Sequence, residues 1–345
     1  MKAVFFKEHG DSSKLEYGDL PEPQLQDGYA LVKVRAVALN HLDIWVRRGW
    51  PGLKLNLPHI GGSDIAGELV AIKGTSVDQT FTPNSRVVVN PGVNTIVDEW
   101  TRRGEDSLSP SYKIIGEQLP GGMADYIVVP IANLIKIPDH ISFEEAAAPI
   151  LVGMTSWRML FKRGLLQTGE TVLVVGSGGG VNSMSILLAK AAGATVIALA
   201  GGEEKAKRAA KLGADYVINY KSLQNWHLEV LKITSGRGVD LVIDNVGKAT
   251  FEGSIRSVRR GGKIVTVGNT SGYEIVFDNR LLFTKQISLI GSTMGSSQDL
   301  FDFLNFFWTR KMKPVIDRVA PLKDGPQMLK LLEIGEQFGK IVLSV

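Results

Sequence analysis

The sequence predicts an α/β protein that combines a doubly wound parallel sheet with a separate β-rich domain. The first observation is the stretch 171–200, in which an apolar run, TVLVV, precedes a glycine cluster, a helix of small residues and a second apolar run, TVIALA. This order is typical of a β-α-β unit with strands buried on both faces. The second observation is that strands and helices keep alternating after residue 200, which predicts six parallel strands. The third is a set of short β-rich runs before residue 130, including YALVKVRAVAL, SRVVVNPG and MADYIVVP, which predict a folded-over β-barrel.

The same patterns predict how the chain is organised. We expect a β-rich catalytic domain over 1–151, a parallel-sheet domain over 152–292 and a return segment over 293–345. The last run, FGKIVLSV, comes too late for the parallel sheet, so we assign it to the first domain. Ser142 and Glu145 predict a capping box at the start of the helix that leads toward the parallel sheet.

Composition excludes several classes of protein. The 345 residues are long enough for two cores, and 44% apolar with 21% charged residues is ordinary for a globular protein. The net charge is only +4 with both signs interspersed, so we expect no nucleic-acid partner. No apolar run reaches the ~18 residues of a membrane span. The charged start MKAVFFKEHG is unlike a signal peptide, so we expect a cytoplasmic protein with no membrane partner.

The glycine cluster predicts a dinucleotide-binding site. Glycines let backbone N–H groups approach a pyrophosphate, and the following helix presents its positive N-terminus to that charge. The G-x-G-x-x-G pattern is incomplete in both registers, since its last place is Val181 in one and Asn182 in the other. An ordinary strand-to-helix turn is therefore the alternative. The expected cofactor contacts here are Gly176, Ser177, Gly178, Gly179, Gly180, Val181 and Asn182.

The whole chain resembles the medium-chain dehydrogenase/reductase superfamily. The strings NHLDIWVRRG, GGSDIAGELVAIKG, GGMADYIVVP and SFEEAAAPILVGMTSWRML occur in the order used by zinc-type alcohol dehydrogenases and quinone oxidoreductases. The resemblance implies a Rossmann dinucleotide domain, a GroES-like catalytic domain and an oxidoreductase that acts on a small-molecule substrate. It also implies a homodimer or homotetramer paired through the strand at 287–294.

The absence of cysteine separates this chain from the zinc-dependent members. Where those members place the Cys, His and Cys ligands of the catalytic zinc, this chain has Asn40, Ser63 and Leu151. The four cysteines of the structural zinc fall on Thr95, Asp98, Thr101 and Ser109. Because these residues cannot replace thiolates and imidazole, we expect no zinc. We also expect no substitute metal site at His41, His59, Asp43 and Asp64.

Losing zinc changes the chemistry that is expected. Zinc lowers the pKa of bound water from ~15.7 to ~7, which is about 12 kcal/mol of help in forming an oxygen anion. Without it, hydride transfer to a quinone or an α,β-unsaturated carbonyl is favoured, because a delocalised anion needs only a few hydrogen-bond donors. Two alternatives stay open: a zinc-independent alcohol dehydrogenase or carbonyl reductase, and a non-enzymatic NADPH-binding protein similar to zeta-crystallin.

The end of the second parallel strand favours NADP(H) over NAD(H). Ala200 stands where NAD-specific relatives carry an Asp, so no acid is expected there to repel a 2′-phosphate. Lys205 and Tyr220 match positions at which relatives contact the adenosine end, whereas Gly202 replaces a frequent phosphate-binding Ser. The nicotinamide half is expected at strand C-termini, beside Asn245, Val246, Gly268, Gly291 and Ser292.

On the substrate side, the resemblance places Asn40, Asp43, Trp45 and Asp64 as candidate catalytic residues, with Thr155 against the nicotinamide. Asn40 alternatively caps the helix that begins at His41. Asp43 and Asp64 are alternatively structural hydrogen-bond acceptors. The indole of Trp45 can donate a hydrogen bond but cannot act as a proton acid. The final proton is then expected from water.

Overall fold

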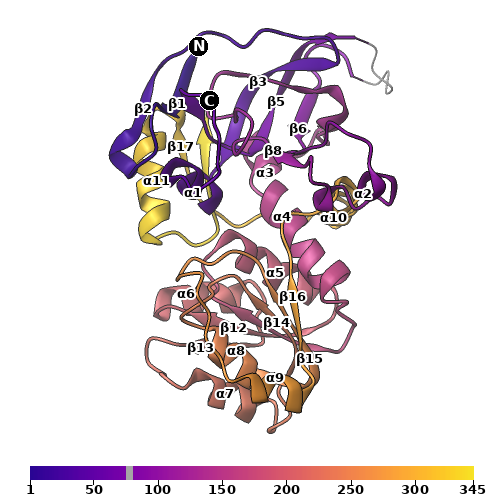
Figure 1. The fold of residues 1–345 in the computed structure, drawn as a ribbon, viewed down its shortest axis with the longest axis vertical. Helices are drawn as coiled ribbons and strands as arrows, with labels where there is room; N and C mark the ends of the chain where they lie inside the picture. The colour runs from indigo at the N-terminus through magenta and orange to yellow at the C-terminus, as the bar shows by residue number, and fades with distance from the viewer. Residues whose placement is uncertain (75–80) are drawn as a thin grey trace. The chain divides into compact units, whose positions relative to one another are not determined.

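The computed structural model describes residues 1–74 and 81–345, which form two compact units (Figure 1). The first unit comprises Met1–Leu151 and Ser296–Val345, and the second comprises Val152–Gly295. The divisions therefore fall after residues 151 and 295, whereas the sequence places them after residues 151 and 292. No helix within the described ranges is long and apolar enough to cross a membrane.

The first unit is a β-rich body built around a seven-stranded sheet. The sheet follows the order β10-β6-β5-β3-β18-β17, and β9 also pairs with β3. Its strands are β3 (Tyr29–Ala38), β5 (Asp64–Lys73), β6 (Arg86–Val89), β9 (Tyr126–Pro130), β10 (Leu134–Lys136), β17 (Ile316–Pro321) and β18 (Lys340–Ser344). A three-stranded sheet has the order β2-β1-β4, with β1 (Lys2–Phe6), β2 (Leu15–Asp19) and β4 (His59–Ile60). A small pair joins β7 (Gly92–Val93) to β8 (Lys113–Ile114).

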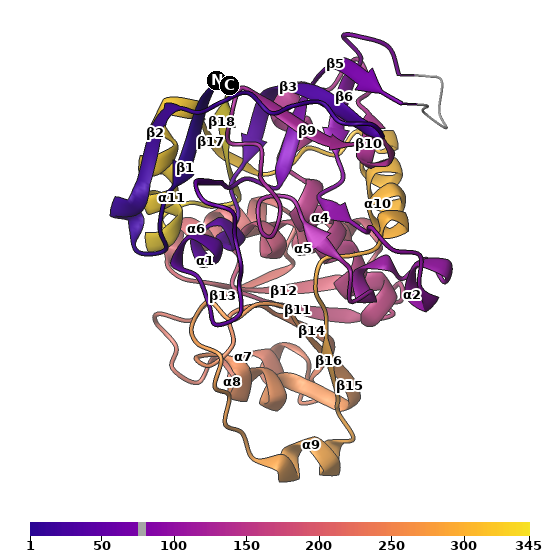
Figure 2. The ribbon, with the colours of Figure 1, turned by 45° about the horizontal axis from the view of Figure 1, so that its top comes forward.

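The C-terminal strand is an inner strand of this seven-stranded sheet, between β3 and β17. β18, part of the run FGKIVLSV, pairs antiparallel with β3, so that Val342 lies opposite Ala38. Alternate apolar residues of both strands, among them Val37, Leu39, Ile341 and Leu343, belong to one hydrophobic core. The chain ends are therefore tied into one body, and both termini lie close together in two views (Figures 1 and 2).

Short helices surround the sheets of the first unit. They are α1 (His41–Arg48), α2 (Glu99–Arg102), α3 (Phe143–Ala147), α10 (Ser297–Thr309) and α11 (Gly325–Ile334). The helix α4 (Ile150–Trp157) contains the division between the units and continues as a π-helical turn, Arg158–Arg163. Half of the predicted capping box at α3 is present, since Ser142 Oγ accepts from the Glu145 N–H at 3.1 Å. The other half is wrong, because the Glu145 carboxylate accepts from Lys313 Nζ at 2.7 Å.

The second unit contains the predicted parallel sheet of six strands. Its order is β13-β12-β11-β14-β15-β16, and every neighbouring pair is parallel. The strands are β11 (Thr171–Val175), β12 (Thr195–Ala200), β13 (Tyr216–Asn219), β14 (Val239–Asp244), β15 (Val258–Thr266) and β16 (Ser288–Gly291). The helices are α5 (Gly180–Ala191), α6 (Glu203–Lys211), α7 (Trp226–Ile233), α8 (Phe251–Ser257) and α9 (Asn279–Lys285). The fold class predicted from the sequence is thus confirmed.

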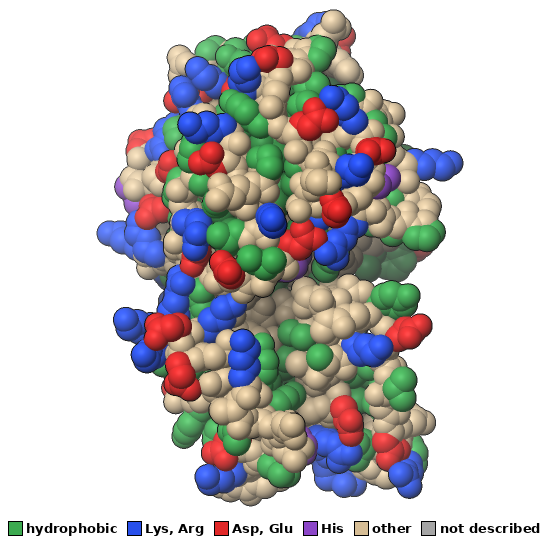
Figure 3. Space-filling view, turned by 90° about the vertical axis from the view of Figure 1, so that its left-hand side faces the viewer, with side chains coloured by type: hydrophobic (Ala, Val, Ile, Leu, Met, Phe, Trp, Pro, Cys, Tyr) green, Lys and Arg blue, Asp and Glu red, His purple; other side chains and the backbone are tan. Residues whose placement is uncertain are grey.

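Strand alternation explains how helices cover one face of this sheet. Leu173 and Ile197 point to the same side of their strands and join a core cluster with Trp226 of α7 and Phe251 of α8. The residues just before these, Val172 and Val196, point to the opposite face of the sheet and are also fully buried. Burial on both faces is what the near-continuous apolar runs predicted. The surface mixes both charges, as the face drawn in Figure 3 shows.

Candidate active site

Strand register brings three polar residues of the first unit together. Asp64 begins β5 and lies opposite Ala38 at the end of β3. Continuing the pairing of β3 with β18 by two residues places Lys340 opposite Asn40, and the Leu39 N–H donates to Ile341 O at 2.9 Å between them. Asn40 follows β3 and precedes α1 in extended backbone. Residues far apart in the chain therefore meet at one end of the sheet.

These three side chains form a closed hydrogen-bonded network. Lys340 Nζ donates to Asn40 Oδ1 at 2.6 Å and to Asp64 Oδ2 at 2.8 Å. Asn40 Nδ2 donates to the same Asp64 oxygen at 2.9 Å. Only 4% of the Lys340 side chain and none of that of Asp64 is exposed. A buried ion pair is tolerated when further hydrogen bonds satisfy both partners, and Asn40 provides such bonds here.

The ion pair occupies the region that holds the catalytic metal in zinc-dependent members, according to the positions carried over from the resemblance. Asn40 bonds to both charged groups, and the backbone N–H of Leu151 donates to Asp64 Oδ1 at 2.7 Å. Ser63 precedes Asp64, and its buried hydroxyl has no partner among the described residues. In those same residues, no three His, Cys, Asp or Glu side chains are grouped to hold a metal. A fixed ammonium group thus stands where the resemblance places the metal ligands.

Asp43 organises the backbone around Asn40. Its two carboxylate oxygens accept from the Asn40 N–H at 2.7 Å and from the Gly62 N–H at 2.8 Å. Burial raises the pKa of Asp43 to about 6 despite these two bonds. Both oxygens are engaged by the backbone, which favours the structural alternative for Asp43 over proton transfer.

His41 lies beside the same network, with its ring 6.4 Å from that of Trp45. Burial, together with the charges of Lys340 and Arg48, lowers the pKa of His41 to about 4. The imidazole is therefore neutral near pH 7 and can donate one hydrogen bond and accept another. The sequence pattern marks His41 only as a candidate for a substitute metal site, and its position beside Lys340 was not predicted.

The loop in which the resemblance places the structural-zinc ligands is joined here by hydrogen bonds. Asp98 caps α2 by accepting from the Trp100 and Thr101 N–H groups, each at 2.9 Å. Its other oxygen accepts from Ser109 Oγ at 2.6 Å, and Thr101 Oγ1 accepts from the Asp98 N–H at 2.8 Å. Three of the four former cysteine positions are thus linked directly, while Thr95 is exposed.

In the second unit, the glycine cluster follows β11 and opens α5. Gly176 has a φ of +81°, a conformation that favours glycine. A Cβ on Gly178 would lie 3.0 Å from Lys205 Cδ and 3.1 Å from Lys205 Nζ. Lys205 therefore lies over the backbone at which the pyrophosphate is expected.

Asn182 explains why the last glycine of the motif is missing. Its amide donates to Val175 O at 2.6 Å and exchanges two 2.9 Å hydrogen bonds with the amide of Asn245. A Cβ on Gly179 would lie 2.5 Å from Asn182 Oδ1, so Gly179 is required instead. The pair of amides joins the ends of β11 and β14, which are adjacent strands.

Five buried hydroxyls in the described part of the second unit lack a hydrogen-bond partner, and three of them belong to residues expected to contact the cofactor. The oxygens Thr155 Oγ1, Ser177 Oγ and Ser292 Oγ are inaccessible and have no hydrogen-bond partner among the described residues. Orphaned buried hydroxyls are costly, which favours a bound ligand that completes them. The glycine cradle and these hydroxyls fit a dinucleotide.

The remaining nicotinamide-side candidates lie at strand ends. Asp244 is fully buried and accepts from the Val246 N–H at 2.9 Å, from Gly247 N–H and from Ser254 Oγ, so it shapes the loop after β14. Gly268 has a φ of +72° just after β15. The Gly291 carbonyl accepts from Arg163 Nε at 3.1 Å, and the Ser292 N–H donates to Thr266 O at 2.9 Å.

The turn after β12 carries a carboxylate, although no acid was expected at the end of this strand. Gly202, with a φ of +117°, donates its N–H to Asn219 Oδ1 at 3.1 Å. Asn219 Nδ2 in turn donates to Glu203 Oε1 at 2.9 Å, so a carboxylate does stand at this turn. Tyr220 is also there, since a Cβ on Gly201 would lie 2.5 Å from its hydroxyl.

Sequence comparisons match both units to known families. Residues 26–139 match the alcohol dehydrogenase GroES-like domain, and residues 180–309 match the zinc-binding dehydrogenase family. The chain is 32% identical to the NAD-dependent alcohol dehydrogenase of Sulfolobus acidocaldarius, with 100% of both chains covered. It is 30% identical to the acryloyl-coenzyme A reductase of Metallosphaera sedula, again with 100% of both covered. A crystal structure described as an NAD-dependent alcohol dehydrogenase has a TM-score of 0.95 at 43% identity and full coverage of both chains.

The parallel sheet, its glycine cluster and the β-rich partner unit define a nicotinamide-dependent oxidoreductase. The chain belongs to the medium-chain dehydrogenase/reductase superfamily.

Proposed function

We propose that this enzyme transfers hydride from NADPH to an α,β-unsaturated carbonyl compound or a quinone, without zinc. The observation that supports the proposal is the buried Lys340 ammonium, held by Asn40 and Asp64, of which Asn40 is a position at which the resemblance expects a ligand of the catalytic metal. The M. sedula relative, named an acryloyl-coenzyme A reductase, supports an activated double bond as the substrate class.

The Lys340 ammonium, partly neutralised by Asp64, is suited to stabilise a delocalised anion such as an enolate. The bound cofactor supplies the hydride. Addition to the β-carbon of an enone leaves negative charge on the carbonyl oxygen, and a preorganised cation stabilises that charge without reorganisation. Lys340 uses two of its three N–H donors on Asn40 and Asp64, which leaves one for an oxygen. Asp64 neutralises part of the ammonium charge, so the support is weaker than that of Zn²⁺ and favours an enolate over a localised alkoxide.

The other proposed site residues act by positioning. Asn40 fixes the ammonium, Asp43 fixes the Asn40 backbone, and the Trp45 indole lies beside His41. Thr155, Ser177 and Ser292 offer unsatisfied hydroxyls to the nicotinamide half, and the Asn182–Asn245 pair holds the two strand ends between which the cofactor would bind. Asp64 orients Lys340 rather than transferring a proton.

We further propose a preference for NADPH, supported by Lys205 over Gly178 and Tyr220 beside Gly201. The Glu203 carboxylate acts in the opposite sense, because it would repel a 2′-phosphate and could accept from a ribose hydroxyl. Relatives named NAD-dependent alcohol dehydrogenases favour NADH as the second candidate.

A substrate panel tests the proposal. Initial rates are measured with crotonyl-CoA, acryloyl-CoA, a cyclic enone, a benzoquinone, an aldehyde and a primary alcohol, each with both cofactors and after dialysis against a chelator. We expect the enones or the quinone to turn over at least tenfold faster than the alcohol or aldehyde, with no loss after chelation. Fastest turnover of the alcohol or aldehyde would support a zinc-independent alcohol dehydrogenase or carbonyl reductase. Tightly bound zinc, found by metal analysis, would contradict the proposed role of Lys340.

A further inference from the structure

A basic cavity lies at the end of the parallel sheet opposite to the glycine cluster. The cavity has a volume of about 530 Å³ and is formed by residues after α7, at the end of α8, at the start of β15 and at the end of α9. The start of β15 is the amino end of a strand, whereas the glycine cluster follows the carboxyl end of β11. Because the strands are parallel, the two sites are on opposite edges of one sheet.

Five cationic side chains line this cavity: Arg237, Arg256, Arg259, Arg260 and Lys285. Three carboxylates offset them. Asp240 pairs with Arg237 and with Arg259, each at 2.5 Å, and Glu252 pairs with Arg256 at 2.8 Å. The Glu170 carboxylate also acts on Arg237, so five positive charges against three negative charges leave an excess of two.

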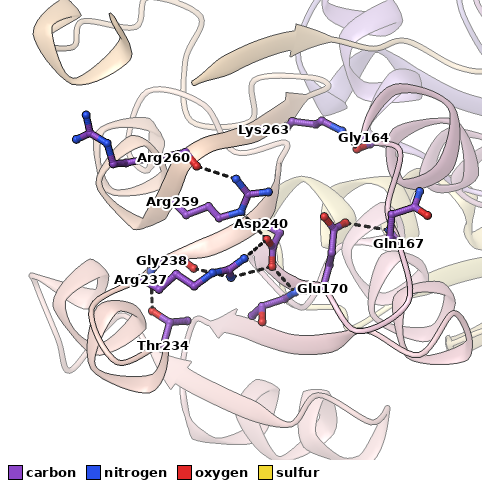
Figure 4. Close-up of polar contacts among 11 residues, drawn as sticks. Gly164, Gln167, Glu170, Thr234, Arg237, Gly238, Asp240, Arg259, Arg260 and Lys263 are labelled. Carbon is purple, nitrogen blue, oxygen red and sulfur yellow. Dashed lines mark hydrogen bonds and ion pairs between the residues drawn. The ribbon is translucent and has the colours of Figure 1, made fainter. Parts of the chain in front are cut away.

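Asp240 makes part of this lining rigid (Figure 4). The figure shows Arg237 and Arg259 converging on its carboxylate, which also accepts from the Thr171 N–H at 2.9 Å. Burial acts to raise the pKa of Asp240, but the hydrogen bonds from both guanidinium groups and from Thr171 hold it at about 2. Asp240 is therefore ionised at neutral pH and fixes two of the arginines in place.

Lys285 and Arg260 supply charge that no carboxylate in the described part of the chain neutralises. Lys285 Nζ donates to the carbonyls of Ile255, Arg256 and Val258 at 3.2, 2.9 and 3.0 Å. Burial lowers the pKa of Lys285, and the charges of Arg256 and Arg260 lower it further. The part of this shift that Arg256 and Arg260 cause reflects their positive potential, which a bound anion would relieve.

Arg260 is the side chain best placed to meet a ligand. One of its Nη atoms donates to Thr284 O at 2.7 Å, and its other donors are directed to no carboxylate in the described residues. A guanidinium group binds phosphate oxygens through paired N–H donors. Leu231 and Val258 add an apolar portion to the lining, and the cavity volume is in the range of small-molecule sites.

We propose that this cavity binds a small molecule that carries a diphosphate or a comparable cluster of phosphate charges, independently of the dinucleotide cofactor. Two excess positive charges match a ligand with two or more negative charges, and a single carboxylate would leave half of the excess uncompensated. The cavity is a second anion site of the Rossmann unit, at the edge that the cofactor does not use.

Calorimetric titration with inorganic pyrophosphate tests this proposal. The full-length protein is first saturated with NADPH so that the cofactor site is filled. We expect saturable binding of one pyrophosphate per chain, weakened at least tenfold by Arg260→Gln and by Arg256→Gln. Arg318→Gln removes an exposed arginine of the first unit that pairs with neighbouring Asp317, and we expect no change from it.

Several outcomes would overturn the proposal. No saturable binding at millimolar pyrophosphate would do so, as would equal weakening by Arg318→Gln, which would indicate a diffuse effect of net charge. Pyrophosphate binding that is seen in a parallel titration without NADPH but not with it would assign the anion to the cofactor site. Tighter binding of a 20-nucleotide RNA than of pyrophosphate would assign the surface to nucleic acid. Thermal unfolding of each variant in parallel verifies that the fold is retained.

Discussion

Lys340 Nζ lies 2.8 Å from Asp64 Oδ2, although the two residues are 276 positions apart in the chain. The last strand of the protein therefore completes a site whose other members come from its first 64 residues. Because both side chains are buried, neither can be removed without leaving a charge that water does not solvate. The contact between Lys340 and Asp64 contributes both to stability and to the proposed chemistry. A variant that neutralises both residues can separate the two contributions.

Lys340→Met should destabilise the protein by about 3 to 5 kcal/mol, because it leaves the buried Asp64 carboxylate unpaired. Adding Asp64→Asn should recover most of this loss, since the remaining groups are neutral. Turnover of the best enone or quinone should stay at least 100-fold below that of the wild type in the double variant. Urea unfolding and steady-state rates measure the two quantities, with Lys313→Met as a control at an exposed lysine. A double variant with normal turnover would show that the ion pair is only structural.

Asn40→Ala should lower kcat/KM for the best enone or quinone about 10- to 1000-fold, because the amide orients the ammonium group. NADPH affinity should be nearly unchanged, since the predicted cofactor contacts are elsewhere. If Asn40 served only as a helix cap, the variant would lose about 1 kcal/mol of stability and keep its turnover. Asn40→Asp sharpens the distinction, because a carboxylate caps a helix well but cannot donate to Asp64 as the amide does, so loss of both stability and turnover would contradict a role limited to capping.

Local pattern made much of the fold predictable, whereas the candidate site depends on register between distant strands. The runs TVLVV and TVIALA and the turn between them specify buried parallel strands because each signal is contiguous. Lys340 was missed because nothing local marks it, and only the pairing of β18 with β3 brings it to Asn40. Asp244 and Asn219 were missed for a related reason. Their roles are hydrogen bonds to loop backbone that no residue spacing reveals.

Lys205→Ala should reduce the ratio of NADPH to NADH affinity by about 10- to 150-fold, because it removes a charge-assisted contact worth ~1.5 to 3 kcal/mol. Glu203→Gln should raise that ratio, since it removes a carboxylate from the same turn while keeping a hydrogen-bond partner for Asn219. Fluorescence titration with both cofactors measures the ratio. A wild-type preference for NADH that Lys205→Ala leaves unaltered would contradict the proposed 2′-phosphate contact.

β16 should form an interface between two copies of the chain, giving a homodimer or a dimer of dimers. It is the last strand of the sheet, and its residue Leu289 is 37% exposed. An exposed apolar edge strand favours pairing with another strand. Light scattering at micromolar concentration should give at least twice the monomer mass. Leu289→Lys should shift the protein toward monomer, and a monomeric wild type would refute the interface.

His41→Gln should change how stability depends on pH between 6.5 and 4. The ordinary pKa of the imidazole is 6.5, and the folded value is about 4, so the folded state favours the neutral ring. The stability that this provides is fully present above pH 6.5 and is lost as the pH falls toward 4, by about 3 kcal/mol in all.

Asp43 acts in the opposite direction over nearly the same range. Its folded pKa of about 6 exceeds the ordinary 3.8, so the folded state gains about 3 kcal/mol of stability as the pH falls from 6 to 4. In the wild type the two contributions nearly cancel, whereas His41→Gln retains only that of Asp43. Urea unfolding at pH 7, 6, 5 and 4 should therefore show that, as the pH falls, the free energy of unfolding of the variant rises by about 3 kcal/mol relative to that of the wild type. A difference that stays constant with pH would mean that His41 is not held neutral by burial beside Lys340.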